Sequence, residues 1–210
     1  MVLHNAIEVD KFIYNENVRN RLKKGMNLND KFVIGHVGRF MEQKNHDYIL
    51  EIFKEVLKEE PNAVLLLMGD GELEEIIKRK AKQLNIYESI KFMGNVNNVN
   101  ELYQVMDVFI LPSLFEGLPV VGIEAQAAGL RCIFSDKVTR ETEITDNVYY
   151  LGIEKNNLKE WKEKILANRT YDRKNQKEKI VRAGYSIEDE AVKLVDKYIE
   201  FVNKGEQMKI

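Results

Sequence analysis

A chain of 210 residues with a net charge of −2 is long enough for one large domain and has no excess of positive charge for binding nucleic acid. Its single cysteine, Cys132, excludes a disulfide within the chain and is typical of a reducing compartment. The sequence contains no recognisable signal peptide and no apolar run of membrane-spanning length, so a cytoplasmic protein is expected.

Short apolar runs alternate with segments of helical periodicity along most of the chain. Residues 1–30 are predicted to be a lead-in segment with a brief helix over Arg19–Met26. The apolar runs predict buried strands at 32–37, 63–68, 90–93, 108–111, 131–134 and 148–151. Helices are expected at 46–59, 72–84, 98–106, 119–129, 156–166, 178–183 and 187–202.

This alternation predicts a Rossmann-like α/β fold, in which a doubly wound parallel sheet has about six strands. Right-handed crossovers bring the loops that follow the strands to one edge of such a sheet, where ligands bind. We therefore expect Gly38-Arg39, Lys44, Gly69-Asp70, Asn95-Val96 and Glu116-Gly117 to converge at that edge.

The stretch from Asp107 to Gly129 contains the most informative loop. An apolar strand is followed by a loop around Gly117, and Pro119 suits the first turn of the helix that follows. The first turn of a helix has backbone N–H groups without intrahelical partners and lies at the positive end of the helix dipole. The pattern therefore predicts an anion site at this turn.

Two carboxylates frame the predicted anion site. Glu116 stands in the loop, and Glu124 lies about 7.5 Å along the helix from Pro119. The Glu124 side chain is expected to lean back toward the start of the helix. Carboxylates accept hydrogen bonds, so the pair suits the hydroxyl groups of a sugar or ribose. Either Glu alone would more readily be a solvated residue, but together with the anion site they indicate a nucleotide-sugar site.

Arg39 and Lys44 follow the first predicted strand, at the edge where Glu116 is also expected. Arg39 could clamp a phosphate with two hydrogen bonds, and Lys44 could add a point charge. An ordinary basic loop is the alternative, but the place at the mouth of a strand favours phosphate binding. His36, inside that strand, is interpreted as a satisfied core histidine rather than a catalytic residue.

Three other segments give weaker signals. Gly69-Asp70-Gly71 lacks the spacing of a phosphate-binding fingerprint. The loop at Asn95-Val96 could meet a nucleobase through its backbone or could be a plain turn, and the sequence leaves both open. Glu188-Asp189-Glu190 is interpreted as acids in the first turn of a helix, and no metal site is predicted.

These motifs together resemble the C-terminal, donor-binding domain of the GT-B type retaining glycosyltransferases of family 4, also called glycosyl transferases group 1. Glu116 and Glu124 match the Glu-x7-Glu motif of that family. The resemblance extends from about Asn5 to the last helix. It rests on Gly38-Arg39 with Lys44, on Gly69-Asp70-Gly71, on Phe92-x-Gly94, and above all on the run from Asp107 to Pro119.

The resemblance implies a role for each matching residue. As catalytic groups, Arg39 and Lys44 would hold the donor diphosphate and stabilise it as the leaving group, and Glu116 would bind hydroxyls of the transferred sugar. The other donor contacts would be Glu124 with the ribose, the backbone of Val96 with the base, and Gly38, Gly117 and Leu118 in the diphosphate loops. The family needs no metal or other cofactor, and the expected donor is a UDP-sugar, with GDP- and ADP-sugars as alternatives.

The resemblance also implies a second domain, because family members carry an N-terminal domain that binds the acceptor. Residues 1–30 would then be an interdomain segment, 31–184 the nucleotide-sugar-binding domain, and 185–210 a helix that crosses back to the N-terminal domain. Asn5-Ala6-Ile7-Glu8 departs from the Asn-Gly-hydrophobic-Asp pattern of the family at this hinge. Any association with the inner face of a membrane would come through the N-terminal domain.

The implied function is transfer of a hexose to a polysaccharide or glycoconjugate, in the synthesis of capsule, exopolysaccharide or another cell-surface glycan. This chain alone is expected to bind a nucleoside diphosphate without transferring sugar. The alternatives are a nucleotide-binding module without chemistry, half of a sugar-nucleotide epimerase, and a phosphorylase. An epimerase should have paired acid–base residues and a phosphorylase a lysine for pyridoxal phosphate, and the sequence offers no clear candidate for either.

Overall fold

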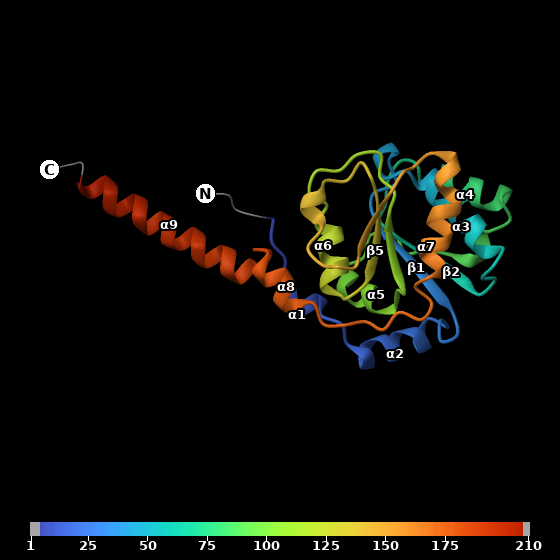
Figure 1. Ribbon diagram of the computed structural model, residues 1–210, viewed down its shortest axis with the longest axis horizontal. Coiled ribbons are helices and arrows are strands. Elements are labelled where there is room, and N and C mark those ends of the chain that lie inside the picture. Colours follow the sequence, from blue (N-terminus) through green and yellow to red (C-terminus); the bar gives the residue numbers. More distant parts are fainter. Residues whose placement is uncertain (1–4, 208–210) are drawn as a thin grey trace.

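A parallel sheet with the strand order β3-β2-β1-β4-β5-β6 lies at the centre of the molecule (Figure 1). The computed structural model describes residues 5–207, so residues 1–4 of the predicted lead-in segment and 208–210 of the last helical segment lie outside the described residues. The six strands are β1 (Phe32–Val37), β2 (Ala63–Met68), β3 (Ile90–Phe92), β4 (Val108–Leu111), β5 (Arg131–Ser135) and β6 (Val148–Leu151). The predicted Rossmann-like α/β fold is confirmed.

Helices cover both faces of the sheet, as the predicted winding requires (Figure 1). They are α1 (Val9–Phe12), α2 (Glu16–Gly25), α3 (His46–Leu57), α4 (Glu74–Gln83), α5 (Val99–Val105), α6 (Val120–Ala127), α7 (Leu158–Leu166), α8 (Lys177–Arg182) and α9 (Ile187–Gln207). Short 3-10 turns lie at Glu42–Lys44, Tyr87–Ser89, Arg140–Thr142 and Lys155–Asn157.

The helical predictions near the N-terminus and at Pro119 need correction. The brief helix begins at Glu16 rather than Arg19, because the side chain of Asn15 accepts the N–H of Val18 at 3.1 Å and caps it. The four-residue helix α1 was too short to be predicted from periodicity. Pro119 is the N-cap of α6 in an extended conformation (ψ 107°) rather than a residue of the first turn.

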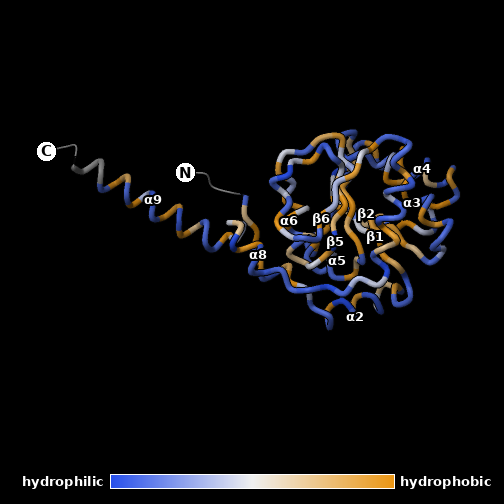
Figure 2. The backbone as a smooth tube through the Cα atoms, viewed as in Figure 1, coloured by the Kyte–Doolittle hydropathy of each residue, from blue (hydrophilic) through white to orange (hydrophobic). Residues whose placement is uncertain are grey.

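The core has two parts, one on each face of the sheet. Along β2, Val64, Leu66 and Met68 face one apolar cluster, while Leu65 and Leu67 face the other. The first cluster also contains residues of α1, α5, α6 and α8, and the second contains residues of α3, α4 and α7. Figure 2 shows the resulting concentration of apolar residues along the strands. Burial on both faces explains why the strands read as continuous apolar runs.

The strand order reverses direction between β1 and β4, which are neighbours in the sheet although 70 residues, 38–107, lie between them in the chain. The carboxyl ends of the strands on the β1 side are tied together by backbone hydrogen bonds. Gly38 N donates to Met68 O at 2.9 Å, and Gly69 N donates to Gly94 O at 2.8 Å. A side chain at Gly69 (φ +132°) would meet the carbonyl oxygen of Gly38 at 2.2 Å, so the close approach of the two loops requires glycine there.

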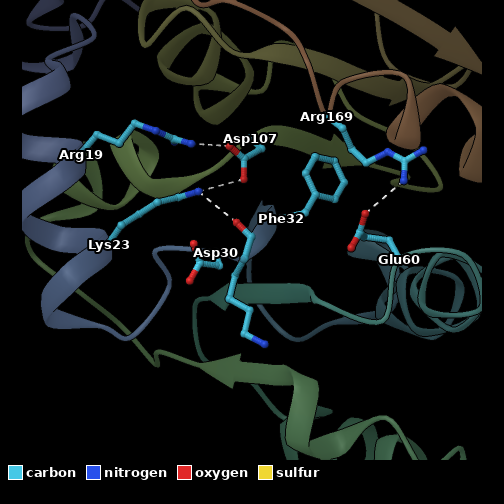
Figure 3. Close-up of a pocket in the computed structure, with 8 residues that line it drawn as sticks. Arg19, Lys23, Asp30, Phe32, Glu60, Asp107 and Arg169 are labelled. Carbon is cyan, nitrogen blue, oxygen red and sulfur yellow. Dashed lines mark hydrogen bonds and ion pairs between the residues drawn. The ribbon is translucent and has the colours of Figure 1, made fainter.

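A cluster of charged side chains attaches α2 to the amino ends of the central strands, opposite the ends where the predicted site residues lie. Arg19 and Lys23 point from α2 toward Asp107, which also accepts the backbone N–H of Val33 at 2.7 Å (Figure 3). The neighbouring cavity of about 330 Å³ is also lined by an ion pair between Arg169 and Glu60 at 3.1 Å. The cluster connects α2 and β1 to Asp107, which directly precedes β4, so its role is to stabilise the fold.

The first described residues lie beside the segment that joins α8 to α9, and α9 projects away from the domain beyond this point (Figure 1). Ile7 N donates to Tyr185 O at 2.9 Å, and Ile187 N donates to Ile7 O at 3.0 Å. The apolar residues of α9 beyond this point include Val192, Tyr198 and Phe201, which are 61%, 65% and 64% exposed. None of the helices described between residues 5 and 207 has the length and apolarity needed to cross a membrane.

Candidate functional site

The candidate site lies at the reversal point of the sheet, between the loops that follow β1 and β4. Gln43, in the first loop, fastens the second loop through three hydrogen bonds. Its backbone oxygen accepts the N–H of Leu114 at 2.8 Å, and its amide donates to Phe115 O at 2.9 Å and to Glu116 Oε2 at 3.4 Å. The two loops predicted to converge therefore form one structural unit.

Lys44 and Glu116, the two predicted ligands of the diphosphate and the sugar, form an ion pair with each other. Lys44 Nζ contacts Glu116 Oε1, and the two side chains are only 15% and 9% exposed. The hydroxyl of Ser113 donates to the same carboxylate oxygen at 2.9 Å. Glu116 is thus held by three donors from two loops, and a ligand that uses either charged group must share or replace this pair.

Arg39 and Gly38 lie on the β1 side of the ion pair. The guanidinium of Arg39 is exposed and has no ion pair or hydrogen bond to the described residues. A Cβ atom at Gly38 would lie 3.1 Å from the Cγ and Cδ atoms of Lys44 and 2.8 Å from Nε2 of His36. The glycine therefore leaves the room that the Lys44 stem needs to reach across to Glu116.

The start of α6 presents the predicted anion-binding groups. The backbone N–H groups of Gly117, Leu118, Val120 and Val121 have no hydrogen-bond acceptor in the part of the chain that the structure describes. Gly117 is exposed, and a Cβ atom built on it would meet no atom within 4 Å. Because α6 runs for eight residues from this turn, its dipole adds partial positive charge to the same place.

Glu124 lies one turn inside α6 and is half-buried. Its Oε2 atom accepts a hydrogen bond from the hydroxyl of Tyr103 at 2.9 Å. Burial raises the pKa of the Glu124 carboxyl, and the hydrogen bond from Tyr103 opposes that rise. Within residues 5–207, Glu124 makes no hydrogen bond or ion pair with Arg39, Lys44 or Glu116. Val96 is half-buried in the loop after β3, which is linked to the site through Gly94.

Two buried histidines lie beneath the loop after β1. His36 Nδ1 is 3.0 Å from Ile110 O, and the ring of His46 stacks on Phe40 with 4.2 Å between ring centroids. Burial lowers the pKa of His36 to about 4 and that of His46 to about 2, so both rings are neutral at physiological pH. His36 is a core residue as predicted, although its Nε2 has no partner among the described residues.

Sequence reasoning missed Gln43, Ser113 and Tyr103, which hold the two carboxylates of the site. Ser113 had a signal, because it stands in the run that carries the resemblance. Nothing in the sequence pattern linked Gln43 or Tyr103 to a carboxylate far away in the chain. Across the described residues, no group of three or more His, Cys, Asp or Glu side chains is placed to hold a metal ion.

The family model described as glycosyl transferases group 1 matches residues 17–186. The putative glycosyltransferase EpsF of Bacillus subtilis is 38% identical over 143 residues, which are 68% of this chain and 37% of that protein. The UDP-Gal:alpha-D-GlcNAc-diphosphoundecaprenol alpha-1,3-galactosyltransferase of Escherichia coli is 31% identical over 211 residues, which are 96% of this chain and 54% of that protein. The chain therefore spans about half or less of the length of these relatives.

Solved structures share the fold at low sequence identity. HepE of Anabaena in complex with UDP-glucose matches 97% of this chain and 57% of its own with a TM-score of 0.74 and 16% identity. The C-terminal domain of a group 1 glycosyl transferase family protein, LpcC of Francisella tularensis, matches 84% of this chain and 97% of its own with a TM-score of 0.63 and 18% identity.

Proposed function

The chain belongs to the glycosyl transferases group 1 family, and from this premise we propose that it is the donor-binding, C-terminal half of a retaining GT-B glycosyltransferase of family 4. The proposed donor is a UDP-sugar, since HepE has been solved with UDP-glucose and the E. coli relative is named for UDP-Gal. The proposed acceptor is a growing polysaccharide or glycoconjugate of the cell surface, because that E. coli relative is named for a diphosphoundecaprenol-linked acceptor.

One observation carries the proposal: backbone N–H groups with no acceptor among the described residues lie at the start of α6, in the same loop as Glu116, whose carboxylate is bound to Lys44. This loop combines donors for a phosphate, a cation and an acceptor for hydroxyl groups. A diphosphate at the α6 turn would accept hydrogen bonds from the backbone N–H groups of Gly117 and Leu118 and would form an ion pair with Lys44. Arg39, exposed and unpaired in the described chain, would clamp it from the β1 side.

In the proposed chemistry, the Lys44 ammonium group exchanges the Glu116 carboxylate for the donor diphosphate as its partner. When the diphosphate draws the ammonium group away, Glu116 Oε1 becomes available to accept a hydroxyl of the transferred sugar, while Ser113 and Gln43 keep the carboxylate in place. As the bond between the sugar and the diphosphate breaks, negative charge grows on the phosphate oxygens. Arg39, Lys44 and the α6 dipole stabilise that charge once the donor is bound.

We propose Glu124 as the ligand of the ribose and the backbone of Val96 as the contact of the base. Glu124 lies farther along α6 than the diphosphate turn, on the helix whose start binds the phosphate. Val96 belongs to the β3 loop, on the β1 side of the site. A nucleotide across the reversal point would then have its phosphates at α6 and its base toward β3.

We further propose that the acceptor binds to a second domain. Residues 1–30 would connect to an acceptor-binding domain, 31–184 would bind the donor, and 185–210 would cross back to that domain. The exposed apolar residues of α9 support this arrangement, because an isolated domain gains nothing from presenting Val192, Tyr198 and Phe201 to water. Any membrane association is assigned to the acceptor-binding domain, and the location is proposed to be the cytoplasm.

Isothermal titration of the 210-residue chain with UDP, GDP and ADP tests the proposal. We expect UDP to bind most tightly, and Glu124→Ala to weaken UDP binding about tenfold or more. Glu163→Ala, which removes an exposed carboxylate of α7, is the matched control and should leave binding unchanged. The proposal is wrong if no nucleoside diphosphate binds, or if the chain alone transfers sugar from UDP-glucose.

A further inference from the structure

A buried tyrosine of α5 contacts the carboxylate that we assign to the ribose. The side chain of Tyr103 is fully buried, and its hydroxyl lies 2.9 Å from Glu124 Oε2 and 3.2 Å from Val121 O. Its ring packs against Phe12 and Phe109, each with 5.9 Å between ring centroids. These contacts on the ring fix the direction in which the hydroxyl points.

The backbone of α5 at Tyr103 is held as firmly as its ring. Arg173 donates to the carbonyl oxygen of Tyr103 at 3.0 Å and also contacts that of Met106. Arg19 donates to Gln104 O and Met106 O at 2.9 and 2.8 Å. Two guanidinium groups therefore hold the C-terminal end of α5, where the helix dipole favours cations. The hydroxyl of Tyr103 is a donor with little freedom to move.

The hydrogen bond makes the two oxygens of Glu124 inequivalent. A phenol has one proton, and the shorter contact directs it to Oε2 of the carboxylate. The other oxygen, Oε1, has no hydrogen bond to the described residues and is not among the buried polar atoms without a partner. Oε1 is therefore the acceptor that Glu124 presents to solvent or to a ligand.

We infer that Tyr103 is a positioning residue for ribose recognition, because it occupies Oε2 of Glu124 and leaves Oε1 oriented to accept one ribose hydroxyl. This inference rests on the proposed function. Without the phenol, the carboxylate would turn freely about its last torsion, and burial would favour its protonated form, which accepts poorly. The contribution of Tyr103 to affinity should then exist only for ligands that carry the recognised hydroxyl.

A thermodynamic cycle tests this role. The 210-residue chain and its Tyr103→Phe variant are titrated with UDP, 2′-deoxy-UDP and 3′-deoxy-UDP. We expect the unchanged chain to bind one deoxy analogue about tenfold more weakly than UDP, and Tyr103→Phe to remove most of this preference while binding that analogue as the unchanged chain does. Tyr198→Phe, which removes a hydroxyl from the exposed face of α9, should retain the preference.

The pH dependence of UDP affinity gives a second measurement. Because the Tyr103 hydrogen bond lowers the pKa of Glu124, Tyr103→Phe should make affinity fall at a higher pH as the solution is acidified over about pH 8 to 4. If the phenylalanine variant does not fold, 3-fluorotyrosine at position 103 keeps the ring and strengthens the donor, and it should move the fall to lower pH.

The outcomes separate the inference from the proposed function. A chain that does not bind UDP overturns the proposed function, and the inference with it. UDP binding with a hydroxyl preference that Tyr103→Phe retains overturns the inference alone. An equal loss of affinity for all three nucleotides in Tyr103→Phe also overturns it, because it shows a structural role. A pH dependence that neither variant shifts does the same.

Discussion

Replacing Glu116 by glutamine separates two roles of its carboxylate: the ion pair with Lys44 in the structure and the proposed contact with a sugar hydroxyl. In the structure Glu116 holds Lys44, while Ser113 and Gln43 hold Glu116. Glutamine keeps the size of the side chain and one acceptor oxygen but removes the charge. The Lys44 ammonium then loses its ionic partner and becomes free for a phosphate. We therefore predict that Glu116→Gln binds UDP, which has no sugar, more tightly than the unchanged chain.

The magnitude follows from the burial of the pair. Two unit charges about 4 Å apart attract by about 4 kcal/mol at the effective dielectric of a protein surface, and desolvation cancels much of this. With side chains 9% and 15% exposed, a net value of about 1–2 kcal/mol is reasonable for the pair. UDP affinity should rise about 5- to 30-fold, while the free energy of unfolding falls by about 1–2 kcal/mol, which for this chain length lowers Tm by about 2–8 °C.

The assay pairs calorimetric titration with thermal unfolding in the same buffer. Lys44→Met should weaken UDP binding about tenfold, and the double variant with Glu116→Gln should bind as weakly as Lys44→Met alone. Glu143→Gln, which removes an exposed charge 3.7 Å from Arg140, is the control and should change neither quantity. If Glu116→Gln weakened UDP binding as much as Lys44→Met does, the ion pair would be part of the binding conformation, and the exchange of partners would be refuted.

Two further predictions concern other charged groups, and a third concerns the exposed helix α9. Burial raises the pKa of Glu124 in the folded chain, so ionisation of Glu124 destabilises the fold once the pH exceeds the unfolded pKa. Glu124→Gln should therefore raise the free energy of unfolding at pH 7 by up to about 1 kcal/mol. The same variant should weaken UDP binding in titrations. Asp107→Asn removes the charge shared by Arg19 and Lys23 and should cost about 3 kcal/mol in denaturant unfolding, with UDP affinity unchanged because Asp107 precedes β4 at the edge away from the site. Ending the chain after Ala191 should leave Tm within about 2 °C and abolish any concentration-dependent association in sedimentation, because most apolar residues beyond it are exposed.

The strands and most helices could be predicted because their signals are local. β2 is buried on both faces, so all six of its residues are apolar and its bounds follow directly from the sequence. The start of α2 was missed because it depends on one cap, Asn15, rather than on periodicity. The turn at Pro119 was assigned correctly in kind but displaced by one residue, since proline suits both the cap and the first turn.

The sequence predicted that the loops after β1 and β4 meet at one edge of the sheet, but not which of their side chains pair. Glu116 and Glu124 are near each other in sequence, and their motif was visible. The partners of these carboxylates come from elsewhere: Lys44 is 72 residues from Glu116, and Tyr103 is 21 residues from Glu124. Which side chains meet depends on β4 lying beside β1, and an apolar run carries no information about its neighbours in the sheet.

The pairing of Lys44 with Glu116 gives a physical reason for placing the site where the strand order reverses. A donor site needs a cation for phosphate and a carboxylate for hydroxyls, and either charge would be costly to leave half-buried and unpaired. Side by side at the ends of β1 and β4, the two neutralise each other until a donor arrives. In the proposed binding mode, a nucleoside diphosphate sugar would replace both halves of the pair at once, with phosphate for Lys44 and hydroxyl for Glu116. UDP alone replaces only one half. We therefore expect Glu116→Gln to reduce the ratio of UDP-sugar affinity to UDP affinity, and an unchanged ratio would show that the carboxylate does not contact the sugar.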